Sequence, residues 1–234
     1  MLFMPVWDLN PIKKIKFQYV TVAIIAINTA IYFLFETHLI LRVPESFVNL
    51  LSLRPGDERP LSSFLQHLPE QYRLVTYLFL HGSVWHLFGN MLFLYVFGDN
   101  VEDAMGHIRF TVFYLLCGTL AALVHSVMTP SPDMTLIGAS GAVSGVIGAY
   151  LMLHPNIRVW VLMPVPVLPF LPLRFSAGFV IGVWILYQLI SALYLSQGPT
   201  AWWAHIGGFL AGMLLVTVMK RPGVRLFDAS TGVS

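Results

Sequence analysis

The chain has 234 residues, of which 57% are hydrophobic and only 10% are charged, and its mean hydropathy is +0.75. Because soluble domains carry about 25% charged residues, this composition excludes an ordinary soluble domain and indicates that lipid is the main solvent. The net charge of +2 gives no sign of a nucleic-acid partner, since the basic residues flank apolar segments, and the single cysteine, Cys117, excludes an internal disulfide.

Six apolar segments are candidates for membrane-spanning helices, which need about 20 residues with a range of about 17 to 25. With approximate ends, they are 17–35, 85–101, 110–128, 140–155, 173–195 and 202–219. The second and fourth are short and contain Gly or polar residues, so we expect the others to shield them from lipid. The sequence therefore predicts an all-α polytopic membrane protein.

Two connections between the predicted helices have an unusual composition. Residues 38–80 mix charges, Pro and Gly with apolar patches at 47–53 and 64–68, which favours amphipathic segments lying in the outer interface of the membrane. Residues 163–172 contain four prolines, which forbid a regular helix. We therefore expect a loop along the inner face there.

The basic residues predict the orientation. One side of the membrane would hold Lys13, Lys14, Lys16, Arg109, Arg158, Arg174, Lys220, Arg221 and Arg225, and the other Arg42, Arg54, Arg59 and Arg73. Because Lys and Arg concentrate on the cytoplasmic side, we expect 1–16 to be a cytoplasmic N-terminal segment, 17–219 the membrane domain and 220–234 a cytoplasmic tail. The first 16 residues lack the features of a signal or transit peptide, which favours a multi-pass protein of a bacterial inner membrane.

Polar residues at the start of the second predicted helix form the first candidate site. His86 and Asn90 are four residues apart and share one helical face, and their hydrogen-bond donors suit a developing oxyanion. The same groups could instead bond across helices and hold them together. A zinc site from His81, His86 and His205 is disfavoured, because no HExxH motif or carboxylate partner lies nearby.

Ser140 stands between glycines at the start of the fourth predicted helix, in the run Gly138-Ala139-Ser140-Gly141. A serine at a helix N-terminus is usually a cap. The flanking glycines, however, allow a sharp turn and a close approach of other groups, and a helix N-terminus offers free N–H groups to an anion. The alternative to a cap is a nucleophilic hydroxyl whose own N–H helps to hold an oxyanion.

His205 lies in the last predicted helix, and Gly208 and Gly212 share its face as a small-xxx-small seam. The fourth helix has a matching face of small residues, namely Gly141, Ser144, Gly145 and Gly148. We expect the two faces to pack and to bring His205 within hydrogen-bonding reach of Ser140. No acidic residue lies near this helix to orient the histidine, so the pattern predicts a Ser–His dyad for nucleophilic acyl transfer.

Together these motifs resemble the rhomboid family of intramembrane serine proteases, over about residues 72–219. The family's HxxxxHxxxN motif corresponds to His81, His86 and Asn90, and its GxSG motif to Gly138, Ser140 and Gly141. Its AHxxGxxxG motif corresponds to Ala204, His205, Gly208 and Gly212, and its glycine–glutamate pattern to Gly98, Glu102 and Gly106. The resemblance implies a six-helix rhomboid-like bundle with a membrane-associated outer loop between helices 1 and 2.

The resemblance also implies the role of each residue. Ser140 would be the nucleophile and His205 its general base, while His86, Asn90 and the Ser140 N–H would form the oxyanion hole. The supporting residues would be His81, Gly138, Gly141, Gly208 and Gly212. Transmembrane proteins in the bilayer would be the substrates, entering beside Trp184 and Tyr187 of the fifth helix, and no cofactor or metal is implied.

Two residues depart from the family pattern, and two other functions compete with proteolysis. Tyr72-Arg73 replaces the common Trp-Arg pair, and Ser144 replaces an aromatic residue that stacks on the histidine. A catalytically inactive relative that binds membrane proteins is the main alternative, although such members typically lack the serine or the histidine. A transporter is disfavoured because the halves show no repeat and the spans carry no charged path.

Overall fold

The computed structural model describes residues 4–37, 45–53, 72–129, 135–163, 171–195 and 200–228. Its longer helices are α1 (Tyr19–Ile31), continued by the π-helical turn η1 (Tyr32–Glu36), α4 (Val84–Met105), α5 (His107–Met128), α6 (Ser140–Leu153), α7 (Ala177–Tyr194) and α8 (Trp202–Met219). Shorter elements are α2 (Glu45–Leu51), α3 (Arg73–Thr76), the 3-10 turn η4 (Tyr77–Phe79), β1 (Met4–Asp8), β2 (Arg158–Met163) and β3 (Leu171–Ser176).

A helix lies at each of the six predicted segments. Among the described residues, α5, α7 and α8 are long and apolar enough to cross a membrane, and the helices at 19–35 and 140–153 are apolar but shorter. The 22 residues of α4 include Asp99, Glu102 and Asp103 near their C-terminal end. The protein is thus an integral membrane protein of mostly helical architecture, and the count of six spans stays a prediction.

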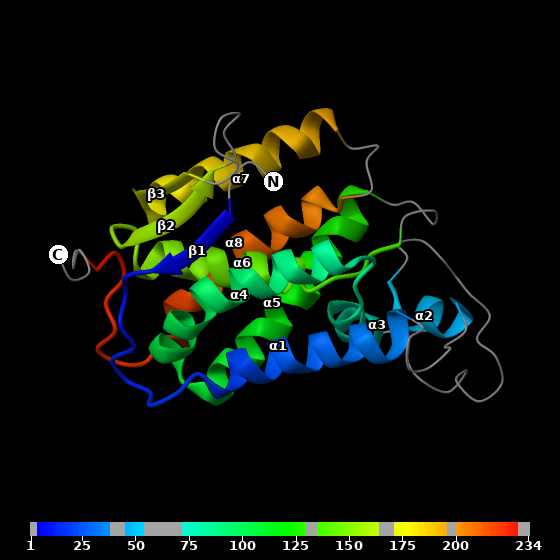
Figure 1. Ribbon diagram of the computed structural model, residues 1–234, viewed down its shortest axis with the longest axis horizontal. Helices are drawn as coiled ribbons and strands as arrows, with labels where there is room; N and C mark the ends of the chain where they lie inside the picture. The colour runs from blue at the N-terminus through cyan, green and yellow to red at the C-terminus, as the bar shows by residue number, and fades with distance from the viewer. Residues whose placement is uncertain are drawn as a thin grey trace.

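The prediction of an all-α chain is wrong, because the described residues include a three-stranded antiparallel sheet in the order β1-β2-β3. Residues from 173 onward, assigned above to the fifth helix, pair with β2, for example Leu173 with Val161, and α7 begins only at Ala177. Ser176 caps α7, since its hydroxyl accepts from the Phe179 N–H at 3.3 Å. The sheet lies at the end of the helices away from α2 and α3 (Figure 1).

Part of the predicted interfacial loop is described. The helix α2 falls in the first apolar patch, and the second patch, 64–68, lies outside the described residues. Tyr72 and Arg73, the altered pair of the sequence motif, both donate to the Leu50 carbonyl at 2.9 and 3.1 Å. These bonds attach α2 to the turn that leads into α4.

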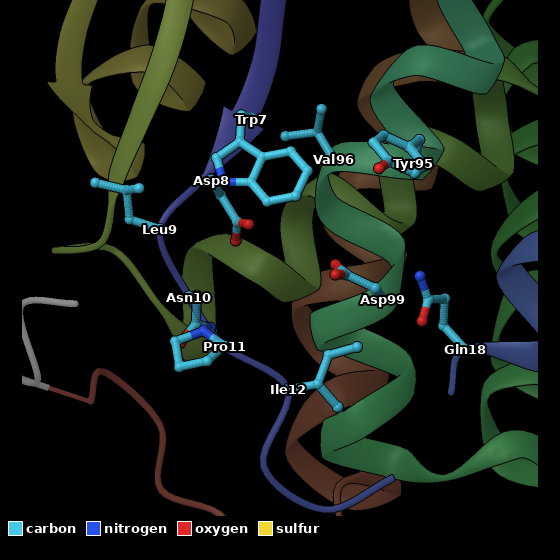
Figure 2. Close-up of a pocket in the computed structure, with 10 residues that line it drawn as sticks. All are labelled: Trp7, Asp8, Leu9, Asn10, Pro11, Ile12, Gln18, Tyr95, Val96 and Asp99. Atoms are coloured by element: carbon cyan, nitrogen blue, oxygen red, sulfur yellow. The ribbon is translucent and has the colours of Figure 1, made fainter. Parts of the chain in front are cut away.

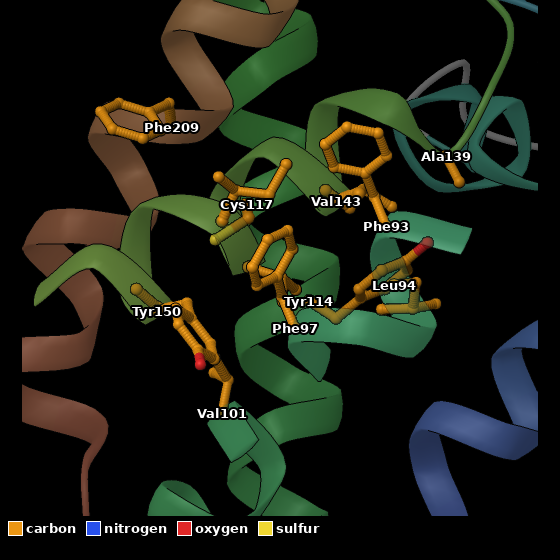
Figure 3. Packing of buried hydrophobic residues seen from close by; sticks show 14 of the residues in the cluster. Phe93, Leu94, Phe97, Val101, Tyr114, Cys117, Ala139, Val143, Tyr150 and Phe209 are labelled. Atoms are coloured by element: carbon orange, nitrogen blue, oxygen red, sulfur yellow. The ribbon is translucent and has the colours of Figure 1, made fainter. Parts of the chain in front are cut away.

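The centre of the bundle is α6, which packs most extensively on α8 and also on α5 and α4. Figure 3 shows Tyr150 of α6 beside Phe97 of α4, with ring centroids 4.9 Å apart. Cys117 of α5 is fully buried against α6, where a Cβ atom added to Gly145 would lie 2.5 Å from its Sγ. The thiol is therefore a packing group.

Glycines allow α6 and α8 to touch backbone to backbone. A Cβ atom added to Gly208 would overlap the carbonyl oxygen of Gly141, and one added to Gly212 would overlap that of Gly145. A Cβ on Gly148 would overlap the Phe209 carbonyl in the same way. The expected packing of two small-residue faces is confirmed.

The acidic end of α4 is bonded to the N-terminal segment. Glu102 is fully buried and accepts from the N–H groups of Val20 and Thr21, at 3.0 and 2.8 Å, and from the Thr21 hydroxyl at 2.7 Å. Asp103 accepts from the backbone N–H groups of Lys13, Lys14 and Ile15. Glu102 thus caps α1, because the first N–H groups of a helix have no partner within it.

A cavity of about 440 Å³ lies between β1 and α4, and Figure 2 shows the carboxylates of Asp8 and Asp99 facing it. Oδ2 of Asp8 accepts from Tyr150 Oη at 2.6 Å and from Asn100 Nδ2 at 3.0 Å. Burial raises the pKa of Asp8 to about 7. None of the predicted site residues lines this cavity.

Candidate active site

Ser140 is the first residue of α6, and its hydroxyl does not cap the helix. The N-cap residue is Ala139, whose side chain makes no capping hydrogen bond, and no other described side chain bonds to the first N–H groups of α6. The preceding loop is fixed by a 2.9 Å bond from the Gly138 N–H to the Tyr77 carbonyl and by the pairing of Leu53 with Leu136. The half-exposed Ser140 therefore presents its hydroxyl beside a helix N-terminus with free donors.

His86 and Asn90 approach the same loop from α4. Gly138 has φ +115°, a conformation that L side chains rarely adopt, and a Cβ there would lie 2.7 Å from Nε2 of His86 and 3.6 Å from Nδ2 of Asn90. Glycine is thus required twice, by conformation and by space. The structure brings together His86, Asn90 and the segment that carries Ser140.

The side chain of Asn90 is 7% exposed, and its Nδ2 has no hydrogen-bond partner among the residues that the structure describes. A buried donor without a partner is costly, and such groups in native structures usually have a reason. A ligand oxygen placed beside Gly138 would satisfy it. His81, fully buried, packs its ring edge-on against that of His86 at 5.1 Å.

His205 is held by groups that the sequence analysis did not identify. Its Nδ1 lies 2.8 Å from Oε1 of Gln188 on α7. Its ring centroid is 6.3 Å from that of Trp184 and 6.1 Å from that of Trp202. The sequence did contain a signal for these groups. Gln188 is an amide in an apolar helix and follows Trp184 by four residues, so both side chains lie on one helical face.

The seam between α6 and α8 places Ser140 and His205 next to touching residues. A Cβ on Gly141 would lie 3.8 Å from the carbonyl oxygen of Ala204, the residue before His205. Across the described ranges, no hydrogen bond joins Ser140 to His205. The Ser144 hydroxyl donates to the Ser140 carbonyl at 2.6 Å, so it contributes to the helix and not to holding the histidine.

His86 of α4 and His125 of α5 are near enough to His205 to interact with it electrostatically. Within the part of the chain that the structure describes, no three His, Cys, Asp or Glu side chains form a group that could hold a metal ion. The arrangement offers a hydroxyl, an imidazole and several N–H donors, which is the chemistry of acyl transfer.

Comparison with known proteins agrees with these motifs. A family model described as the Rhomboid domain matches residues 69–222. RHOMBOID-like protein 1 of Arabidopsis thaliana is 27% identical over 238 aligned residues, which cover 92% of this chain and 57% of that protein. RHOMBOID-like protein 5 of the same plant is 30% identical, covering 65% of this chain and 46% of that protein.

A bacterial relative, the Rhomboid protease GluP of Bacillus subtilis (strain 168), is 30% identical over 68% of this chain and 29% of that protein. The chain spans about half the length of the two Arabidopsis relatives. Because the matched model covers well over half of the chain and includes every motif described above, this protein belongs to the rhomboid family.

Proposed function

We propose that this protein is an intramembrane serine endopeptidase that hydrolyses peptide bonds in or near the transmembrane segments of other membrane proteins. The observation that carries the proposal is the buried, unpartnered amide of Asn90 beside Gly138. It is a donor aimed at the loop before Ser140, where an oxyanion would form if Ser140 attacked a carbonyl.

The proposed reaction uses a dyad and has two halves. Ser140 Oγ attacks the peptide carbonyl while His205 Nε2 takes its proton, and the tetrahedral oxyanion is held by His86, Asn90 and the Ser140 N–H. The intermediate collapses, and the leaving amine receives the proton from His205. Water then attacks the acyl-enzyme with His205 again as general base, which releases the second product and restores Ser140.

The substrate must expose a carbonyl that a helix would keep hydrogen-bonded. Local unwinding is easiest where a segment contains Gly, Pro or other weak helix formers. The close glycine contacts around Ser140 favour a small side chain before the cut. Mapping of the cleavage site on a single-span substrate checks this preference, and bulky residues at that position would contradict it.

One relative supports the chemistry, and the placement of basic residues supports the orientation. The Bacillus relative is named a protease, and the excess of Lys and Arg beside the two termini supports a cytoplasmic location for both. We place the protein in a bacterial inner membrane as part of the same proposal. No cofactor takes part in the proposed reaction.

The alternative is an inactive rhomboid-like factor that binds membrane proteins. It is favoured by one observation, the lack of a hydrogen bond between Ser140 and His205 in the described residues. Under this alternative the histidine would hold α7 through Gln188 and would never act as a base.

The test uses purified protein in liposomes with a single-span reporter, comparing wild type with Ser140→Ala and His205→Ala. We expect cleavage by the wild type alone. Equal cleavage by Ser140→Ala would refute the assigned nucleophile. If no variant cleaves, a fluorophosphonate probe separates the two functions: labelling of Ser140 that requires His205 supports the protease, and no labelling supports the inactive factor.

A further inference from the structure

Gln188 is a buried amide in an otherwise apolar part of α7. Its side chain is 5% exposed, and its Oε1 lies 2.8 Å from Nδ1 of His205. Burying an amide in a membrane helix is costly unless the amide is hydrogen-bonded. The bond to His205 offsets this cost and ties α7 to the imidazole that the proposed reaction uses.

Three side chains fix the position of the His205 ring. Trp184 lies one turn before Gln188 on α7, and its ring plane is inclined by 32° to the imidazole. Trp202, on the histidine's own helix, stands at 89° to it. The two indoles limit the tilt of the ring, and the amide selects which nitrogen faces α7.

The acceptor character of the amide oxygen also decides where the proton sits. A carbonyl oxygen accepts and cannot donate, so Nδ1 must carry the hydrogen in this bond. A neutral imidazole protonated on Nδ1 has its lone pair on Nε2, the atom that would take the Ser140 proton. With the amide reversed, Nδ1 would accept and Nε2 would be protonated, which removes the base.

We infer that Gln188 is a positioning residue that holds His205 in the Nδ1–H tautomer, a role that rests on the proposed Ser–His mechanism. It takes the place of a carboxylate, which no described residue supplies behind the histidine, and of an aromatic ring at position 144, where this chain has Ser144. The titratable groups that act on His205 from other helices include His86 of α4 and His125 of α5. Unlike a carboxylate, the neutral amide orients the ring without stabilising the imidazolium by charge.

The first experiment compares Gln188→Leu, Gln188→Glu and Ser191→Ala in the liposome cleavage assay. Leu keeps the size but removes the acceptor, so we expect kcat to fall about 10- to 100-fold while KM stays within about twofold. Ser191, another buried polar residue of α7, is the matched control, and its variant should keep the wild-type kcat.

Gln188→Glu separates positioning from packing. A carboxylate accepts the same bond and stabilises the imidazolium, so this variant should recover activity relative to Gln188→Leu and move the acid limb of the kcat/KM profile to higher pH. Wild-type kcat in Gln188→Leu, or a Glu variant as weak as Leu with an unshifted profile, would overturn the inference.

The second experiment needs no catalysis. Nitrogen-15 NMR of histidine-labelled Ser140→Ala protein, with the His205 signals assigned by loss in the double variant with His205→Ala, reports the tautomer directly. We expect Nδ1–H in the parent and a mixture of tautomers in Gln188→Leu. If the His205 tautomer is the same in Gln188→Leu as in the parent, the inference is wrong even if the wild type is an active protease. If the tautomer changes but the wild type neither cleaves the reporter nor is labelled at Ser140 by the fluorophosphonate probe, the inferred bond is supported and the proposed function is contradicted.

Discussion

Asn90 illustrates how a single donor can link stability to activity. Its amide is almost fully buried and its Nδ2 has no partner among the described residues, so the folded state bears the cost of desolvating that group. A donor already in place and already dehydrated does not need to reorganise when negative charge appears on a substrate oxygen. Such a group costs stability in the resting protein and, in the proposed reaction, would lower the barrier.

Asn90→Ala should therefore lower kcat by about 10²–10³, equivalent to about 2.7–4 kcal/mol, with little change in KM. The matched control is Asn28→Ala, because Asn28 is a buried asparagine of α1 whose amide donates to the Ile24 carbonyl of its own helix. Steady-state cleavage in liposomes measures both. Equal losses in the two variants would mean that Asn90 acts only through folding.

At this scale the sequence identified the motif residues but not what holds them. Ser140, His86 and Asn90 could be selected because serine between glycines and two polar residues on one face are rare in apolar segments. Gln188 belongs to no short motif, and its partner lies 17 residues further along the chain on another helix. Only the packing of α7 on α8 reveals the bond.

The seam between α6 and α8 is the element that positions the proposed dyad. The glycine contacts leave no space for a Cβ atom, so the distance between the helix axes is set by backbone atoms. Close backbone approach of this kind is how membrane helices associate when apolar side chains have no preference for each other over lipid. The proposed catalytic geometry thus depends on residues that have no part in the proposed chemistry.

Gly212→Ala should destabilise the bundle by about 1–3 kcal/mol or more, because the new Cβ would overlap the Gly145 carbonyl and force the helices apart. Gly182→Ala is the matched control in α7, since nothing lies within 4 Å of its Cβ position, and it should be neutral or slightly stabilising. Thermal unfolding in detergent compares the two. Equal melting temperatures of the two variants would contradict the tight packing of α6 on α8.

Element ends were the weakest part of the sequence prediction. Only the ends of the predicted loop at 163–172 are described, and they belong to β2 and β3, whereas 164–170 lie outside the described residues. The part of β3 from 173 to 176 was assigned to the fifth span because a few β residues and a few helix residues have the same hydropathy. The pairing partner of β2 on its other side, β1, comes from the first eight residues of the chain. Local sequence patterns cannot predict the pairing of two strands that are separated by about 150 residues.

For the molecule as a whole, Asp8 connects three parts of the fold. It belongs to the sheet, it accepts from Asn100 of α4, and it accepts from Tyr150 of α6. Its burial raises its pKa from 3.8 to about 7. The folded protein therefore holds a proton that the unfolded chain releases, and ionisation of Asp8 opposes folding.

The contribution of Asp8 to the free energy of unfolding should fall by about 1.4 kcal/mol for each pH unit between about 4 and 7, and be constant above. Asp8→Asn cannot ionise and still offers an acceptor oxygen. Relative to wild type, it should gain stability as the pH rises through this range. Melting temperatures of both proteins in detergent from pH 4.5 to 8 test this. If the melting temperatures of the two proteins change with pH in parallel, Asp8 does not contribute as expected.

The bond between Glu102 and the start of α1 has a consequence for how the protein is made. Thr21 and Glu102 are separated by 81 residues, and ribosomes add about 5–20 residues per second. The first helix therefore emerges about 4–16 s before the carboxylate that completes its N-terminus. During that interval the first N–H groups of α1 lack their partner, and the carboxylate of Glu102 on α4 then accepts from them. The N-terminus of α1 is thus completed only when α4 has been synthesised and packs against it.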